Sequence, residues 1–234
     1  MICAPSAPWH GKKPSMSNLS HPFMRNLPEG KGAILTFSKF ANQEADAIPE
    51  LMEHIQLVGT HDCRTCVGLY IKMNETTCLM AHINATSKYR RLRNEMAPGD
   101  RAVFPYEGEQ IYGDVLAMLN LEANLLNWDS TAKAQTKYVV CCPKTVGKAR
   151  DGRWFKYTGY YVLAAIRTFL DKTESEFEWK SWGGFIVDQN TGDVVQKFPW
   201  DAEAYKREVT LGLEKYTVVD EVENVKEWKF ENVN

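Results

Sequence analysis

The sequence predicts an α/β or α+β fold in which a mainly antiparallel sheet is flanked by helices. Three observations support this fold. Apolar β-branched segments occur as neighbouring pairs joined by short turns, and other segments repeat their apolar residues at helical spacing. In addition, 44% of the 234 residues are hydrophobic, which is enough to bury one large core. Five prolines within residues 1–30 indicate an irregular N-terminal arm, so we expect a single domain over residues 31–234.

Each predicted element follows from a local pattern. Runs of β-branched and aromatic residues bounded by turn residues predict strands, and apolar residues three and four apart predict helices. Asn190-Thr191-Gly192 is typical of a hairpin turn, and Asp201 suits the N-cap of a helix. These patterns predict strands at 33–37, 66–72, 76–83, 138–142, 184–188 and 193–197, and helices at 43–57, 113–126, 160–170 and from Asp201 onward.

The predicted hairpin of residues 66–72 and 76–83 carries the residues of greatest chemical interest. With Met73-Asn74-Glu75 as its loop, Cys66 lies directly opposite His82. Directly opposed residues have Cβ atoms about 5 Å apart, so a thiol there reaches an imidazole. A one-residue slip in register would move His82 to the other face of the sheet. The pairing therefore depends on the length of the loop.

A cysteine beside a histidine is a typical pair for nucleophilic catalysis. The imidazole removes the proton from the thiol, and the thiolate then attacks a carbonyl carbon. Gly68, two residues after Cys66 on the same face, would leave space for a substrate. The same residues also suit an inert core, because small cysteines and hydrogen-bonded histidines are often buried. The residues alone leave both interpretations open.

A zinc site is a further interpretation of this region. Cys63, Cys66, Cys78 and His82 are spaced C-x2-C-x11-C-x3-H, which is close to the spacing of zinc fingers. However, the residues between Cys66 and Cys78 alternate as a strand does, and a chain of this length folds without a metal. We therefore expect neither a metal nor another cofactor. A zinc-stabilised module that binds nucleic acid remains the alternative.

The segment Thr60-His61-Asp62-Cys63-Arg64-Thr65-Cys66-Val67, followed by Met80-Ala81-His82, resembles the T-x-G-x-G-S-C-V…A-H pattern of bacterial chemoreceptor glutamine deamidases. That family has a layered α/β fold and a Cys-His-Thr catalytic site. The resemblance implies that Cys66 is the nucleophile, that His82 is the base and that Thr60 orients the base. It covers residues 60–82, and the glycine-rich approach to the family's cysteine is replaced here by other residues.

The Cys-Val-Gly strand and the segment Ala81-His82-Ile83-Asn84-Ala85 are similar to those of a class of fungal proteins. This class includes arginine-containing cyclodipeptide synthases, which join two amino acids carried by tRNA into a diketopiperazine. The resemblance implies a thioester on Cys66, an aminoacyl-tRNA partner and a small product derived from amino acids. An acid near the site, such as Asp62 or Glu75, would then hold a guanidinium group.

Basic residues concentrate in two segments, although the formal net charge is only −2. Residues 86–101 hold five bases against two acids, and residues 131–156 hold seven bases against one acid, with aromatic residues and glycines among them. Such segments either form solvated faces or grip phosphates and stack on nucleotide bases. On the second interpretation, the predicted tRNA contacts are Lys88, Arg90, Arg91, Arg93, Lys144, Lys148, Arg150 and Arg153.

The use of cysteine favours a reducing compartment. The six cysteines lack the regular spacing of a disulfide scaffold. The sequence also lacks the run of 18 apolar residues that would predict a membrane span. We therefore expect a cytoplasmic protein with no membrane contact. The specific prediction is a tRNA-dependent cyclodipeptide synthase. The general one is a Cys-His acyltransferase or amidohydrolase, such as a protein glutamine deamidase, and the oligomeric state is left open.

Overall fold

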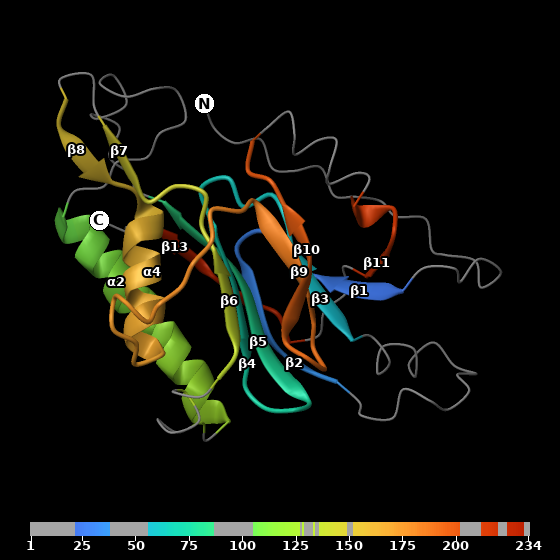
Figure 1. The fold of residues 1–234 in the computed structure, drawn as a ribbon. Helices are drawn as coiled ribbons and strands as arrows, with labels where there is room; N and C mark the ends of the chain where they lie inside the picture. The colour runs from blue at the N-terminus through green and yellow to red at the C-terminus, as the bar shows by residue number, and fades with distance from the viewer. Residues whose placement is uncertain are drawn as a thin grey trace.

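The structure is a computed structural model that describes residues 22–37, 56–86, 105–126, 128, 133, 136–148, 152–201, 212–219 and 224–231. Within these residues the chain forms three layers (Figure 1). A pair of helices covers one face of a central sheet, and a second sheet packs against the opposite face. The predicted fold class is therefore confirmed: the chain has an α+β fold with mainly antiparallel sheets and flanking helices.

The central sheet contains the hairpin predicted from the sequence. Its long strand, β5 (Thr77–Thr86), pairs antiparallel with β2 and β4 and parallel with β13. Strand β6 (Tyr138–Cys141) pairs antiparallel with β4 and lies at the end of the sheet. The other strands of this sheet are β2 (Lys31–Thr36), β4 (Val67–Lys72), β12 (Lys226–Glu227) and β13 (Lys229–Glu231).

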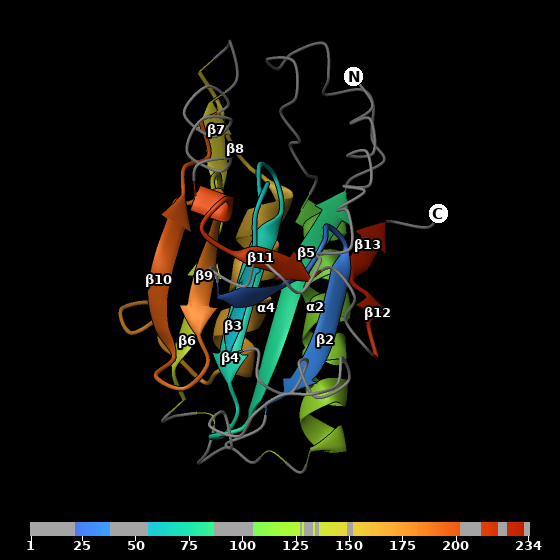
Figure 2. The same ribbon diagram turned by 90° about the vertical axis from the view of Figure 1, so that its right-hand side faces the viewer.

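The second sheet brings together segments from the two ends of the described chain, as the turned view in Figure 2 shows. Its order is β10-β9-β3-β1-β11, and β1 runs parallel to both of its neighbours. A separate small hairpin of β7 (Val146–Lys148) and β8 (Trp154–Lys156) leads into the second helix. The strands of the second sheet are β1 (Phe23–Asn26), β3 (Leu57–Thr60), β9 (Gly184–Asp188), β10 (Asp193–Phe198) and β11 (Thr217–Val219).

The helices α2 (Pro105–Leu125) and α4 (Thr158–Phe169) pack against each other and against the central sheet. Helix α2 buries apolar residues four positions apart, which line one face of a helix; they are Ile111, Val115, Leu119 and Ala123. The ring of Tyr161 in α4 occupies the space beside Gly108, where a Cβ atom would lie 2.0 Å from the ring. The close contact of the two helices therefore needs a glycine at this position.

The central strands are buried on both faces because they lie between the helices and the second sheet. Leu69 and Ile71 of β4 point toward the helices, whereas Tyr70 belongs to the cluster between the two sheets. On β5, Leu79 and Ala81 likewise face the helices, and Met80 faces the second sheet. Residue parity therefore places His82 on the side of Met80, between the two sheets.

Most of the predicted elements are present in the described residues, with shifted boundaries. The strands near residues 33–37 and 138–142, both hairpins and the helix at 160–170 are confirmed. Helix α2 begins eight residues before the predicted residue 113, at Pro105. The predicted helix at 43–57 lies largely outside the described residues, and its last residue, Leu57, belongs to strand β3. Of the helix predicted from Asp201, residues 202–211 lie outside them.

The N-terminal arm is not wholly irregular. Residues 23–26 of the predicted arm form β1, which lies between β3 and β11. A four-residue strand of this kind carries little sequence signal of its own, because its pairing partners supply the hydrogen bonds. Residues 1–21 lie outside the described residues. None of the helices formed by the described residues has the length and apolar character needed to cross a membrane.

Candidate functional site

The candidate site lies between the two sheets, where β3 ends and β4 begins. Strand β3 ends at Thr60, and the connection to β4 contains both Cys63 and Cys66. The N–H of Cys63 donates to the carbonyl oxygen of Gly183 at 2.8 Å, which ties this connection to the start of β9. Asp62, directly before Cys63, has a positive φ of 63°. Such a conformation is uncommon for a non-glycine residue and is enriched in Asp and at functional sites.

The predicted register of the hairpin is wrong by two residues. His82 lies opposite Gly68 rather than opposite Cys66, which precedes the first residue of β4. The reason is a longer turn, in which the side chain of Asn74 accepts a hydrogen bond from the N–H of Thr76 at 2.8 Å. Because the shift is by two residues, His82 keeps the face that was expected for it.

Hydrogen bonds fix the orientation and the tautomer of His82. The Thr60 hydroxyl donates to the carbonyl oxygen of Leu27 at 2.9 Å, and its oxygen lies 2.8 Å from His82 Nδ1. A hydroxyl has a single hydrogen, so Nδ1 must carry the proton shared with Thr60. Nε2 is then the nitrogen with a lone pair. Thr60 therefore contacts the histidine that it was expected to orient.

The lone pair of His82 faces a cysteine that was not predicted to be the nucleophile. Cys63 Sγ lies 3.6 Å from His82 Nε2. A thiol at this distance from an imidazole nitrogen is in place to transfer its proton. The exposed fractions of Thr60, Cys63 and His82 are 1%, 0% and 1%, so the three side chains are enclosed within the protein.

The enclosure keeps both members of the pair uncharged at rest. Burial lowers the pKa of His82 to about 3, and the nearby His61 contributes in the same direction. A hydrogen bond to Cys141, followed by burial, raises the pKa of the Cys63 thiol well above its usual value. The resting pair is therefore a neutral thiol and a neutral imidazole at physiological pH.

Cys66 has a different partner. Its thiol lies 3.4 Å from Glu29 Oε1, and the same oxygen accepts a hydrogen bond from Asn84 Nδ2 at 2.7 Å. Glu29 is exposed and belongs to the turn before β2, whereas Cys66 is buried. The thiol of Cys66 therefore faces a carboxylate acceptor and not an imidazole.

A cluster of thiols surrounds the pair. Cys63 and Cys141 are hydrogen-bonded through their side chains, and Cys66 and Cys142 lie near enough to influence the titration of Cys63. Gly68 makes room for this cluster, because a Cβ atom there would lie 2.8 Å from Cys141 Sγ. The five cysteines within the described residues are not in disulfides. The space expected beside Gly68 is thus filled by Cys141.

The geometry does not support the four-ligand zinc site. Cys78 and His82 lie on the same strand four residues apart, which is about 13 Å in an extended chain. Ligands of one zinc ion must all lie within about 2.3 Å of the metal. Among the described residues, no group of three or more His, Cys, Asp or Glu side chains is arranged to hold a metal ion.

No protein-family model matches the chain, and no curated protein matches its sequence. The two resemblances of the cysteine and histidine segments therefore stay predictions. The site rests on its geometry alone.

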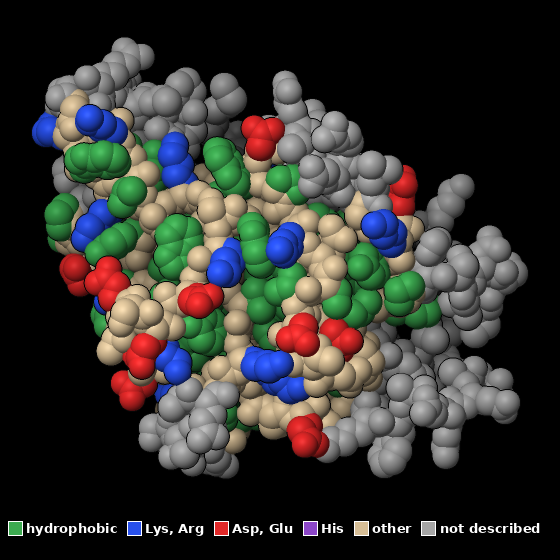
Figure 3. Space-filling view, viewed as in Figure 1, with side chains coloured by type: hydrophobic (Ala, Val, Ile, Leu, Met, Phe, Trp, Pro, Cys, Tyr) green, Lys and Arg blue, Asp and Glu red, His purple; other side chains and the backbone are tan. Residues whose placement is uncertain are grey.

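The predicted basic residues fall partly outside the described chain. Lys88, Arg90, Arg91, Arg93 and Arg150 lie in segments that the structure does not describe. Lys144, Lys148 and Arg153 belong to the β7–β8 hairpin and its approach. Figure 3 shows Lys, Arg and hydrophobic side chains gathered over this hairpin, at the upper left of the molecule.

Lysines of this hairpin and its approach lie over aromatic rings of β8 and of the start of α4, of which Tyr157 is buried. Lys148 Nζ lies 5.7 Å from the ring centroid of Trp154, which is 70% exposed. Lys144 lies over Tyr157 at 4.9 Å, and Lys156 lies over Tyr160 at 3.8 Å. Cys142 Sγ contacts the carbonyl oxygen of Lys144 at 3.5 Å, so the hairpin starts beside the thiol cluster.

Proposed function

We propose that the protein is a cysteine-dependent acyl-transfer enzyme in which Cys63 is the nucleophile, His82 is the base and Thr60 orients His82. The observation that carries the proposal is the chain of contacts from Leu27 O through Thr60 and His82 to Cys63 Sγ. A nucleophile, a base and a group that orients the base, each within hydrogen-bonding reach of the next, form the usual arrangement for nucleophilic catalysis.

The reaction follows from the tautomer of His82. Nε2 takes the proton of the Cys63 thiol while the sulfur attacks a carbonyl carbon, so a C–S bond forms. The tetrahedral intermediate collapses, the bond to the leaving group breaks, and the imidazolium returns the proton to the leaving group. Water or an amine then attacks the thioester with His82 as base again. The C–S bond breaks, and the thiol regains its proton.

Thr60 has a defined part in this cycle. When His82 becomes positively charged, its Nδ1–H continues to donate to the Thr60 oxygen, so the ring does not turn. The Thr60 hydroxyl is itself held by Leu27 O at 2.9 Å. Because Thr60 is neutral, it orients the base without the charge stabilisation that a carboxylate would give. The positive charge on His82 must then be balanced by the thiolate or the oxyanion.

The assignment of Cys63 differs from the residue implied by the resemblance to glutamine deamidases. Cys66 as nucleophile remains a prediction, but its thiol faces the carboxylate of Glu29, whereas Cys63 faces the base. Since Cys63 is wholly buried, a substrate reaches it only when the segments that cover it move. The burial also excludes water from the thioester until that movement occurs.

Labelling of the thiols tests the assignment. The full-length protein is incubated with candidate acyl donors, a glutamine peptide and aminoacyl-tRNA, and its intact mass is then measured. We expect an acyl adduct that Cys63→Ala abolishes and Cys66→Ala preserves. Peptide mapping identifies the modified residue. An adduct lost only in Cys66→Ala would move the nucleophile to Cys66, and the absence of an adduct with either donor in the wild type would refute the enzyme.

Aminoacyl-tRNA is the acyl donor that we favour, because of the β7–β8 hairpin. Exposed rings with adjacent ammonium groups suit both the stacking of bases and contact with phosphates, and this surface starts beside the thiol cluster. The aminoacyl group would pass from its tRNA to Cys63 and then to the amino group of a second aminoacyl-tRNA, which releases the thiol. Attack of the new dipeptide's amino group on its own ester would then close the ring and release the second tRNA, which is the reaction of a tRNA-dependent cyclodipeptide synthase. The alternative donor is a protein glutamine, for which phosphate contacts are unnecessary. A cytoplasmic location suits both, since thiols stay reduced there.

A further inference from the structure

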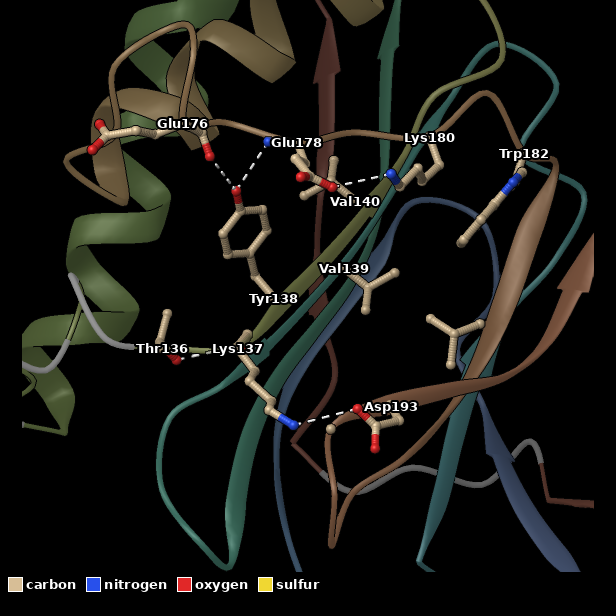
Figure 4. A pocket seen from close by; sticks show the side chains of 12 residues that line it. Thr136, Lys137, Tyr138, Val139, Val140, Glu176, Glu178, Lys180, Trp182 and Asp193 are labelled. Atoms are coloured by element: carbon tan, nitrogen blue, oxygen red, sulfur yellow. Dashed lines mark hydrogen bonds and ion pairs between the residues drawn. The ribbon is translucent and has the colours of Figure 1, made fainter.

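A cleft with a volume of about 460 Å³ opens between β6 and β10, which are edge strands of the two sheets. Figure 4 shows that it lies between β6, the β9–β10 hairpin and the segment that leads into β9. Cavities of several hundred Å³ are the usual size for sites that bind small organic molecules. The residues that line this cleft are distinct from Thr60, Cys63 and His82.

The floor of the cleft is apolar. Val139 of β6 and Val194 of β10 line it together with Trp182. All three are partly buried and pack against the cluster between the sheets, which also contains Cys63 and Cys141. The floor of the cleft is therefore the open end of the layer in which the candidate site lies. An apolar side chain placed there would bury its surface against these three residues.

The rim of the cleft carries an ion pair at each end. Lys137 Nζ lies 3.3 Å from Asp193 Oδ1, and Lys180 Nζ lies 3.0 Å from Glu178 Oε2. Their side chains are between 49% and 75% exposed, so these pairs are weak and exchange easily with a ligand's own charges. Each end of the cleft therefore offers both an anion and a cation to a ligand.

The backbone at the edge of β6 suits an extended ligand. The N–H of Lys180 donates to Val140 O, and the N–H of Cys142 donates to Lys180 O, both at 2.9 Å. This short parallel bridge lies beside Cys141. Tyr138, two residues before Val140, directs its backbone groups toward the same side of the strand. A peptide in the cleft would continue the parallel pairing that Lys180 begins.

The length of the cleft can be estimated from β6. Four residues separate Lys137, at one ion pair, from Cys141, beside which Lys180 lies. At about 3.4 Å per residue this corresponds to about 14 Å, the length of four extended residues. The end of the cleft at Lys180 leads toward the candidate nucleophile. Trp182 precedes Gly183, whose carbonyl oxygen accepts a hydrogen bond from the N–H of Cys63. On β6, Val140 precedes Cys141.

We propose that this cleft binds an extended peptide of about four residues that runs parallel to β6, with apolar side chains on Val139, Trp182 and Val194. The N-terminal ammonium of the peptide lies at Asp193, and its carboxyl end lies at Lys180, on the side of Cys63. The last statement rests on the proposed function, because it makes the peptide a substrate of Cys63. The cleft itself does not depend on that function.

Calorimetric titration of the full-length protein with the free tetrapeptide Gly-Leu-Leu-Gly tests the site. We expect Val194→Asp to weaken binding about tenfold or more, because it leaves a charge under apolar side chains. The matched control is Val195→Asp, the next residue on β10, which is 47% exposed and does not line the cleft. Circular dichroism establishes that both variants are folded.

A second variant remains informative if Val194→Asp does not fold. Asp193 is 68% exposed, and Asp193→Asn should weaken binding of the free peptide about threefold. Acetylation of the peptide should weaken binding equally, and Asp193→Asn should then have no further effect. Equal binding of the acetylated and the free peptide would overturn the placement of the ammonium at Asp193, and a retained dependence on Val194 would still support binding in the cleft.

The proposal is overturned if the tetrapeptide does not bind, or if Val194→Asp and Val195→Asp bind it alike. Repeating the titration with Cys63→Ala measures peptide binding in a protein that lacks the proposed nucleophile, so it separates this proposal from the proposed function. Peptide binding without any acyl adduct on the wild type would retain the cleft and refute the enzyme. An acyl adduct without peptide binding would do the reverse.

Discussion

A 2.8 Å hydrogen bond between His82 Nδ1 and Thr60 Oγ1 connects the two sheets at the candidate site. Thr60 is the last residue of β3 in the second sheet, and His82 lies on β5 in the central sheet. The bond is buried, so the Nδ1–H of His82 depends on the Thr60 oxygen for an acceptor. It therefore acts on both stability and the orientation of the base.

Replacement of Thr60 tests both effects. Thr60→Val leaves the Nδ1–H of His82 without an acceptor and should lower the free energy of unfolding by about 1–3 kcal/mol. Thr60→Ser keeps the hydroxyl and should cost less than this. Urea unfolding measures the difference, and the yield of the acyl adduct should fall in Thr60→Val alone. Equal stability of the two variants would show that the hydroxyl is not needed.

The burial of His82 predicts that the protein loses stability as the pH falls. The pKa of His82 is about 3 in the folded chain against an ordinary value of 6.5, so below pH 6.5 the unfolded chain binds a proton that the folded chain does not. The free energy of unfolding should fall by at most about 1.4 kcal/mol per pH unit from this residue. The loss begins near pH 6.5 and ends near pH 3.

Denaturant unfolding at several pH values in this window measures that effect, with His82→Gln as the comparison. The variant has no group that titrates at this position, so its stability should depend less steeply on pH. Identical slopes for the wild type and His82→Gln would contradict the assignment of a neutral, buried imidazole.

Gly68 should be intolerant of a side chain. A Cβ atom there would lie 2.8 Å from Cys141 Sγ and 3.0 Å from Thr60 Cγ2, so Gly68→Ala should destabilise the fold by about 1–3 kcal/mol. Gly113→Ala is the matched control: Gly113 lies in α2 with nothing within 4 Å of its Cβ position. That change should stabilise the protein by about 0.5–1 kcal/mol. Thermal or urea unfolding of the two variants should therefore give shifts of opposite sign.

Alkylation of Cys63 should be slow at neutral pH and should continue to accelerate above pH 9. The hydrogen bond to Cys141 and burial raise the pKa of this thiol, so its thiolate fraction at neutral pH is below that of an ordinary cysteine. Iodoacetamide labelling at a series of pH values, with peptide mapping, measures the rate at Cys63. Protein unfolded in urea provides the reference rate. A rate that levels off near neutral pH in the folded protein would show a stabilised thiolate instead.

Binding of tRNA should depend on the β7–β8 hairpin. Lys148→Glu removes a cation beside the exposed Trp154, so affinity should fall and the dependence of affinity on salt should become less steep. Lys215→Glu, a charge reversal in the exposed turn before β11, is the control. Filter binding at several salt concentrations measures both. Equal affinities for the two variants would exclude the hairpin as a tRNA contact.

The sequence by itself determined most of the elements and the face on which His82 lies. The runs of β-branched, aromatic and apolar residues in β4 and β5 and the turn at Asn190-Thr191-Gly192 are local signals, and each corresponds to an observed strand or hairpin. Strands β1, β3 and β11 were missed because they are short and gain their order from one another. The predicted register was wrong by two residues, but the face predicted for His82 is still correct, because a shift of two residues keeps a side chain on the same face.

Only the tertiary structure decided which thiol meets the imidazole. The turn after β4 is longer than predicted, and the side chain of Asn74 stabilises it. Because of this turn, Gly68 rather than Cys66 lies opposite His82. Cys63 reaches His82 because its N–H donates to the carbonyl oxygen of Gly183, the residue directly before β9 of the second sheet. That contact joins segments more than 100 residues apart, so no spacing within residues 60–82 encodes it. The cleft beside β6 likewise exists only because the edge strands of two separate sheets lie side by side.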